Sequence, residues 1–126
     1  MSDPTLPEDL VAFLRGAVPS VWTLELLLLM HRRDAEARTV EQLTHELRAN
    51  RTLVADVLAS LHRSGLVIEE GEGTFRYQPA SAELGGLVAR LSRAYAETPF
   101  AVRSAIVAAP NERIQMFADA FRLRKE

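Results

Sequence analysis

Apolar residues recur at every third or fourth position along most of the chain, and this spacing is typical of helices that bury one face. Capping residues, glycines and prolines divide the pattern into seven predicted helices, at 5–16, 20–33, 39–48, 51–64, 82–97, 99–109 and 111–124. The second of these is apolar almost all round from Val21 to Met30, which predicts a central, buried helix. Trp22, near its start, is expected to fill the core.

Residues with capping preferences support these helix boundaries. Two stretches, Thr5–Glu8 and Thr39–Gln42, have the three-residue spacing of a capping box. Gly16 and Gly65 are expected to end the first and fourth helices, with Gly65 in the left-handed conformation that glycine adopts readily. Further candidates for capping a helix start are Asn50, Ser81 and Asn111.

A β-hairpin is predicted after the fourth helix, because "LVIEE" and "TFRYQ" are short β-rich runs on either side of "GEG" at 71–73. It is the only sheet that the pattern predicts. The expected order is four helices, the hairpin and three more helices, so the predicted fold class is mainly α. We expect a single domain over residues 1–126, with an N-terminal helix at 1–19, a core at 20–80 and a C-terminal helical extension at 81–126.

The composition excludes several classes of protein. The absence of cysteine excludes disulfides, thiolate zinc sites and cysteine nucleophiles, and it suits a reducing compartment. The longest apolar run, Leu26 to Met30, is far shorter than the roughly 20 residues of a membrane span. The acidic N-terminus lacks the basic start of a signal peptide. We therefore expect a cytoplasmic protein that does not enter a membrane.

No group of residues predicts catalysis or a cofactor. His31, His45 and His62 fall on three different predicted helices, and we expect all three to lie on helix surfaces. The glycines at 71–73 are flanked by glutamates and lack the pattern of a phosphate-binding loop. We therefore expect no enzyme activity, no cofactor and no metal.

The order of elements from Thr39 onward resembles a known superfamily. Thr39 begins one helix, "RAN" forms a tight turn, the helix at 51–64 follows, and Gly65-Leu66-Val67 leads into the hairpin. In this order, residues 39–78 resemble the winged helix-turn-helix superfamily, of the kind seen in MarR-like and ArsR-like bacterial transcriptional regulators. The resemblance implies a winged helix-turn-helix with a small β-hairpin wing and extra N- and C-terminal helices, and it implies double-stranded DNA as the partner.

The resemblance also implies which residues would meet DNA, since the start and outer side of the recognition helix reach base edges in the major groove. Asn50 would cap this helix and touch a phosphate, Arg51 would pair with a guanine or a phosphate, and Thr52 could contact either. Asp56 does not fit a DNA contact unless it accepts from a cytosine amino group or orients Arg51. The expected phosphate contacts are Arg48, Arg63 and Arg76.

The charge of the same segment leaves a second interpretation open. Between Thr39 and Gln78 there are four arginines and six carboxylates, so the segment has a net charge of −2, equal to that of the whole chain. The expected wing is acidic at Glu69, Glu70 and Glu72, whereas phosphate binding favours positive charge. Arg32, Arg33 and Arg38 form a possible basic flank. The alternative function is a winged-helix protein-interaction module with weak or lost DNA binding, in which the acidic wing and the face of the helix at 51–64 lined by leucine and alanine contact a protein partner. Asp56 on this helix and the negative net charge support this alternative.

The C-terminal extension carries more apolar residues than the winged core needs, namely Phe100, Ile106, Val107, Ile114, Phe117 and Phe121. They could pack on their own domain or form a two-fold interface. We expect a homodimer through the C-terminal helices, because two copies would double the phosphate contacts on one duplex.

Overall fold

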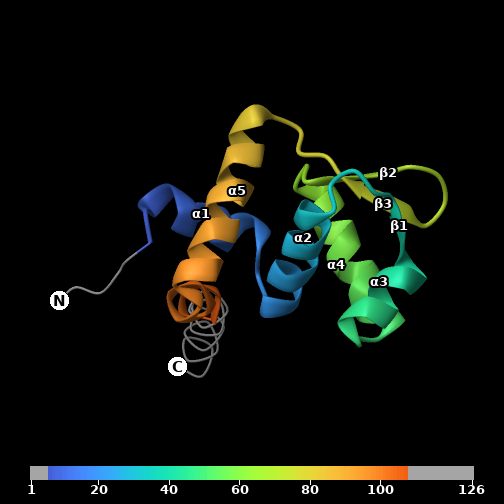
Figure 1. The fold of residues 1–126 in the computed structure, drawn as a ribbon, viewed down its shortest axis with the longest axis horizontal. Helices are drawn as coiled ribbons and strands as arrows, with labels where there is room; N and C mark the ends of the chain where they lie inside the picture. Colours follow the sequence, from blue (N-terminus) through green and yellow to red (C-terminus); the bar gives the residue numbers. More distant parts are fainter. Residues whose placement is uncertain (1–5, 108–126) are drawn as a thin grey trace, which may run out of the picture.

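Figure 1 shows the computed structural model, which describes residues 6–107 as a mainly helical fold with a small antiparallel sheet. The elements are α1 (Glu8–Ala17), α2 (Val21–Arg32), β1 (Arg38–Thr39), α3 (Val40–Leu47), α4 (Arg51–Arg63), β2 (Val67–Glu69), β3 (Thr74–Tyr77) and α5 (Ala82–Glu97). Residues 99–107 form a further helical segment. The helix predicted at 111–124 and the expected caps Thr5 and Asn111 lie outside the described residues.

Helix α2 lies at the centre of the core, as its nearly uniform apolar sequence predicts. The side chain of Ser20 accepts a hydrogen bond from the Thr23 N–H at 3.1 Å and so caps its start. Helices α3, α4 and α5 and strand β3 all contact it. Its buried residues are Thr23, Leu24, Leu26, Leu27, Leu28, Leu29 and Met30. Burial on several sides explains why this helix has no polar face.

Two expectations about side chains near this core are wrong. Trp22 is 42% exposed rather than buried, because it shares the outward side of α2 with Glu25 and Arg32. His31 is half-buried rather than on the surface, because the last turn of α2 lies against β3, where its ring meets that of Tyr77 edge to face at 5.2 Å. His45 and His62 are exposed, as expected.

Helices α3 and α4 are joined by a three-residue turn, and the predicted caps hold both of their starts. The Thr39 hydroxyl accepts from the Gln42 N–H at 3.1 Å, and the Gln42 side chain accepts from the Thr39 N–H at 2.9 Å, which completes the capping box. Asn50 accepts from the Leu53 N–H at 2.8 Å at the start of α4. Arg48, with φ of 56°, takes the left-handed conformation that ends α3. These local bonds fix the angle at which the chain enters α4.

The sheet has three strands in the order β1-β3-β2, so the expectation of a hairpin alone is incomplete. Strands β2 and β3 pair antiparallel from Val67↔Tyr77 to Glu69↔Phe75, as the hairpin prediction requires. Strand β1 pairs with the free edge of β3 through Arg38↔Phe75 and Thr39↔Thr74. A two-residue strand is too short to show the alternation that marks strands in a sequence. The added strand connects the start of α3 to the hairpin.

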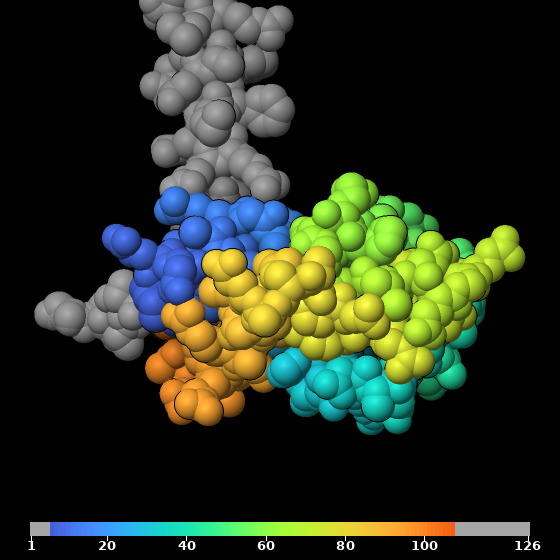
Figure 2. Space-filling view, turned by 90° about the horizontal axis from the view of Figure 1, so that it is seen from above, coloured from blue at the N-terminus to red at the C-terminus, as the bar shows by residue number. Residues whose placement is uncertain are grey.

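The ends of the other helices differ in part from the predictions. Helix α1 begins after Pro7 without a side-chain cap, and Gly16 lies within it rather than at its end. Ser81 caps α5 by accepting from the Leu84 N–H at 3.1 Å, as predicted. Gly65 has φ of 78°, the left-handed value expected after α4. The two views place α1 beside α5 at one end of the described chain, and the β2–β3 loop at the other (Figures 1 and 2).

Candidate nucleic-acid interface

The outer side of α4 is open to solvent along its whole length. Its inner side is buried through Val54, Val57, Leu58 and Leu61. The opposite side is an exposed stripe at intervals of four, three and four residues, formed by Thr52, Asp56, Ala59 and Arg63. Because such intervals keep residues on one side of a helix, the stripe faces outward as a unit. None of the described residues covers it.

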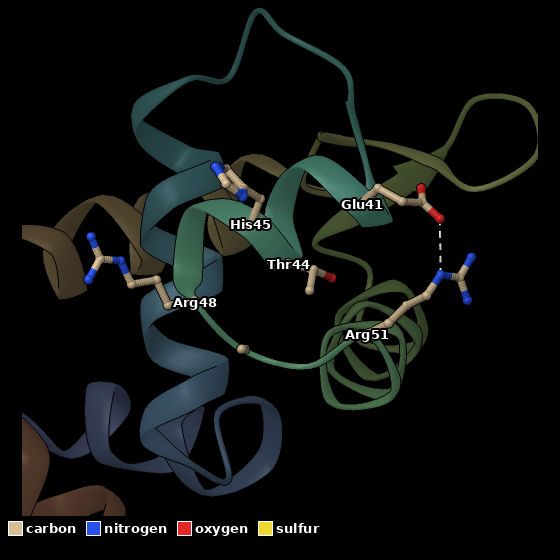
Figure 3. Close-up of a pocket in the computed structure, with 6 residues that line it drawn as sticks. Glu41, Thr44, His45, Arg48 and Arg51 are labelled. Atoms are coloured by element: carbon tan, nitrogen blue, oxygen red, sulfur yellow. Dashed lines mark hydrogen bonds and ion pairs between the residues drawn. The ribbon is translucent and has the colours of Figure 1, made fainter.

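A shallow hollow of about 590 Å³ lies where α3 turns into α4 (Figure 3). The residues that line it are Glu41, Thr44 and His45 from α3, Arg48 and Ala49 from the turn, and Arg51 from α4. The Thr44 hydroxyl is occupied, since it donates to the Val40 carbonyl at 2.7 Å. The side chains of His45 and Arg48 point away from the pair formed by Glu41 and Arg51. The hollow therefore has one ion pair on one side and an exposed arginine on the other.

Arg51, the residue expected to read DNA, is held by a carboxylate of α3. Its Nε donates to Glu41 Oε2 at 3.0 Å, and both side chains are 67% exposed. The pKa of Glu41 lies below its ordinary value, first because the carboxylate accepts from its own backbone N–H and second because of Arg51. The Nε of Arg51 is thus engaged with Glu41, ten positions earlier in the chain, and not with Asp56. Sequence spacing on α4 alone could not identify this partner.

Arg76, expected to contact a phosphate from the hairpin, is also engaged within the chain. Its Nε and Nη2 donate to Glu70 at 2.7 and 3.3 Å, and its Nη1 donates to the Ala35 carbonyl at 2.7 Å. The hydrogen bond to Glu70 is the first cause of a raised Arg76 pKa. Arg76 therefore fastens the hairpin to the loop before β1, and the geometry favours this structural role over a phosphate contact.

Two of the three arginines in the possible basic flank are also paired with carboxylates. Arg38 pairs with Glu46 and lies 3.8 Å from Glu36. Arg33 lies 3.6 Å from Glu46 and 3.9 Å from Glu36. These four residues form a mixed ion-pair cluster beside α3. Arg32, the third member, is exposed.

Arg48 and Arg63 are the predicted phosphate contacts that remain available. Both side chains are exposed, and within residues 6–107 neither has an ion pair. Arg48 lies in the turn just before the start of α4. Because a helix rises about 1.5 Å per residue, Arg63 lies roughly 18 Å along the axis from that start. Thr52 is exposed between them, whereas the Asn50 side chain is used in capping. The available cations therefore lie at the two ends of the exposed stripe, with Asp56 between them.

The described residues do not bring together a metal site or a membrane span. Among residues 6–107, no three histidines, aspartates or glutamates are close enough to hold a metal ion. No single helix in the same range is long and apolar enough to cross a membrane. Helices α1 and α2 meet these requirements of length and apolar content only when they are taken together, and they are bent by 104° relative to each other. The exposed side of α4 and the hollow beside it are thus the surface with the clearest arrangement of polar groups.

Comparison with known proteins identifies no family for this chain. Scans of protein-family models, of curated proteins and of solved structures each returned no match. The surface is defined by its own features, which are the outward stripe of α4, the hollow at the turn before it and the ion pairs around both.

Proposed function

We propose that the protein is a DNA-binding transcriptional regulator, in which residues 39–78 act as a winged helix-turn-helix. In this proposal α3 is the positioning helix, α4 the recognition helix and the β2–β3 hairpin the wing. The observation that supports it most is the exposed stripe of α4, which begins at a capped turn and is not covered by the described residues. A helix of this diameter, presented in this way, fits the major groove of DNA.

The residues in and just before α4 would make different kinds of contact with DNA. Thr52 faces outward where base edges would lie, and Arg51 could reach a guanine or a phosphate once it leaves Glu41. Arg48 and Arg63 would hold phosphates at either end of the helix. Asn50 keeps the first turn of α4 in place through its bond to the Leu53 N–H, so its part would be to orient the helix.

The electrostatics make a single copy a weak binder. Exposed ion pairs exchange partners readily, so the Glu41–Arg51 pair lowers the affinity for phosphate without preventing contact. Asp56 lies in the middle of the stripe, where its carboxylate would repel the phosphate backbone of DNA unless it accepts from a cytosine amino group. A second copy on the same duplex would double the phosphate contacts and compensate for this weakness.

The second candidate function is a protein-interaction module with weak or lost DNA binding. It is favoured by the pairing of Arg51 and Arg76 with Glu41 and Glu70, which engages two of the expected DNA contacts within the chain. The loop between β2 and β3 projects from the molecule and carries exposed Glu72 (Figure 2). A basic partner would meet this loop more favourably than a phosphate backbone would.

A salt titration with random-sequence duplex DNA separates the two functions. DNA binding predicts measurable affinity at low salt, and the double variant Arg48→Ala/Arg63→Ala should reduce the salt slope by about two. Arg51→Ala should abolish binding, and Asp56→Ala should strengthen it. The matched control is Arg93→Ala, an exposed arginine on α5. If the wild-type chain does not bind duplex at low salt, or if Arg93→Ala weakens binding as much as the double variant, the regulator proposal is wrong.

A further inference from the structure

Asp56 lies near the middle of the exposed stripe of α4, with an arginine toward each end of the helix. Because a helix rises about 1.5 Å per residue, Asp56 lies roughly 7.5 Å along the axis from Arg51 and roughly 10.5 Å from Arg63. Its side chain is exposed, and within residues 6–107 it has neither an ion pair nor a hydrogen bond. The carboxylate is therefore free to accept a hydrogen bond from another molecule.

Helix stability does not explain an aspartate at this position. Aspartate is less favourable inside a helix than most residues, and it stabilises a helix mainly at the start, where it caps the first turn or meets the positive end of the dipole. Asp56 lies beyond the first turn of α4, and Asn50 already caps this helix. Because none of the described residues gives Asp56 a structural role, we look for its role at the surface.

The packing removes one of the two ways in which Asp56 could fit a DNA-binding surface. The sequence allowed Asp56 either to orient Arg51 or to accept from a cytosine. Arg51 Nε donates to Glu41 instead, at 3.0 Å. Residues five positions apart on a helix also do not lie on the same side, so Asp56 is poorly placed to replace Glu41. A direct contact with a base is the way that remains.

We propose that Asp56 accepts a hydrogen bond from a cytosine amino group, so that α4 prefers a C·G pair at one position of the duplex. The inference rests on the proposed DNA-binding function. In the major groove only cytosine and adenine present an amino donor, and adenine places its N7 acceptor beside that donor. Guanine and thymine present acceptors there. An ionised carboxylate can only accept, so it is repelled by these acceptors and selects cytosine.

The neighbours of Asp56 on the surface of α4 are small enough for a base edge to come close. Thr52 and Ala59 are its exposed neighbours, four residues before and three residues after it. Leu53 and Ser60, the other two positions one turn away, are half-buried, and Leu53 packs against the core. An aspartate side chain is short and reaches a base only when the helix lies deep in the groove. Long side chains at these positions would prevent this approach.

The ends of α4 favour a duplex over a basic protein as the source of the amino donor. Arg63 in the last turn and Arg48 just before the helix are both exposed, and neither has an ion pair within the described range. A basic protein segment would be repelled by both, whereas the phosphates that border the major groove would attract both. This groove is about 12 Å wide, so a helix with cations toward its ends places its centre over the base edges.

Selection from a pool of duplexes with a random central segment tests the inference. The wild type should enrich a C·G pair at one position and bind this duplex at least about fivefold more tightly than one with another pair there. Asp56→Asn should change the preference at this position to A·T, because an amide pairs with adenine N6 and N7. Asp56→Ala should bind random duplex more tightly than the wild type and show no preference at this position.

The matched control is Glu97→Gln, which also changes an exposed carboxylate to an amide, at the end of α5. It should keep the preference of the wild type. Circular dichroism of each variant shows whether the fold is retained, which is expected because both positions are exposed.

Three outcomes would overturn the inference, and they separate it from the proposed function. If the chain binds duplex but Asp56→Ala and Asp56→Asn enrich the same sequences as the wild type, Asp56 does not read a base, and the regulator proposal is unaffected. If Glu97→Gln changes the preference as much as Asp56→Asn does, the cause is net charge and not a contact with a base. If the wild type does not bind duplex at low salt, the regulator proposal fails and this inference fails with it.

Discussion

Glu41 and Arg51 show how one ion pair controls the surface that we propose for DNA. The Glu41 carboxylate accepts from Arg51 at 3.0 Å, and both groups lie in solvent beside the turn before α4. Such exposed pairs add little to stability, but a carboxylate at this position repels an approaching phosphate. Glu41 therefore affects the proposed function more than it affects the fold.

Replacing Glu41 with Gln should increase the affinity for duplex DNA. The change removes a negative charge and releases the Arg51 guanidinium, so we expect about a two- to five-fold tighter complex at low salt and a smaller gain at high salt. Fluorescence anisotropy with a labelled random duplex measures both. Glu97→Gln, an exposed change on α5, is the control and should leave the affinity unchanged. An unchanged affinity for Glu41→Gln would mean that this surface does not meet DNA.

Gly65 and Gly86 should respond to alanine in opposite directions. Gly65 has φ of +78°, and an added Cβ would lie 3.3 Å from the Ala80 Cβ, so Gly65→Ala should cost at least about 1–2 kcal/mol of stability. Gly86 lies within α5 with nothing near an added Cβ, so Gly86→Ala should stabilise by about 0.5–1 kcal/mol. Urea unfolding monitored by circular dichroism measures both. Equal effects of the two changes would show that the backbone at Gly65 is not strained by alanine.

At the scale of elements, α1 and α5 are joined by a two-point ion pair. The Asp9 carboxylate accepts from Arg90 Nη1 at 2.7 Å and from Nη2 at 2.9 Å. This pairing is the first cause of a lowered Asp9 pKa and of a raised Arg90 pKa. Because the pKa of Asp9 is lower in the folded chain than its ordinary value of 3.8, ionised Asp9 stabilises the folded state.

Stability should therefore depend on pH through Asp9. Its contribution is complete at pH values above the ordinary pKa of 3.8 and is lost as the pH falls through the lower, folded-state value. We expect Asp9→Asn to lower the melting temperature at neutral pH by a few degrees at most, since the pair is exposed. This difference from the wild type should disappear in acid.

Thermal unfolding of the wild type and Asp9→Asn across this pH range tests the prediction. Glu8→Gln is the matched control, because Glu8 is exposed in the same first turn of α1 and has no ion pair in the described part of the chain. Glu8→Gln should change the melting temperature at neutral pH less than Asp9→Asn does. A difference between Asp9→Asn and wild type that persists in strong acid would show that the charge of Asp9 is not its cause.

At the scale of the whole molecule, helix packing leaves two separate surfaces open. The Tyr95 hydroxyl donates to Glu25 at 2.9 Å and accepts from Arg103 at 2.8 and 3.1 Å, so it joins α2, α5 and the segment at 99–107. The Arg103 guanidinium also lies 5.6 Å from the centre of the Tyr95 ring. These contacts hold the segment at 99–107, with its exposed Phe100 and Val107, in place at one end of the molecule. The exposed side of α4 remains open away from it.

The sequence alone determined the features that depend on neighbouring residues. The caps at Thr39, Asn50 and Ser81 and the left-handed Gly65 are where they were predicted, because each involves residues only a few positions apart. The central position of α2 was also predictable, since a helix without a polar side is stable only when it is surrounded. Strand β1 was not, because its two residues pair with a strand more than thirty positions away.

Only the tertiary structure decided which predicted site residues are available. Arg51 and Arg76 matched the expected pattern as well as Arg48 and Arg63 did, but the packing places Glu41, Glu70 and the Ala35 carbonyl beside the first two. It also decided that Ile106 is buried while Phe100 is exposed. Ion pairs and burial depend on the distance between side chains brought together by folding, which the periodicity of a single segment does not contain.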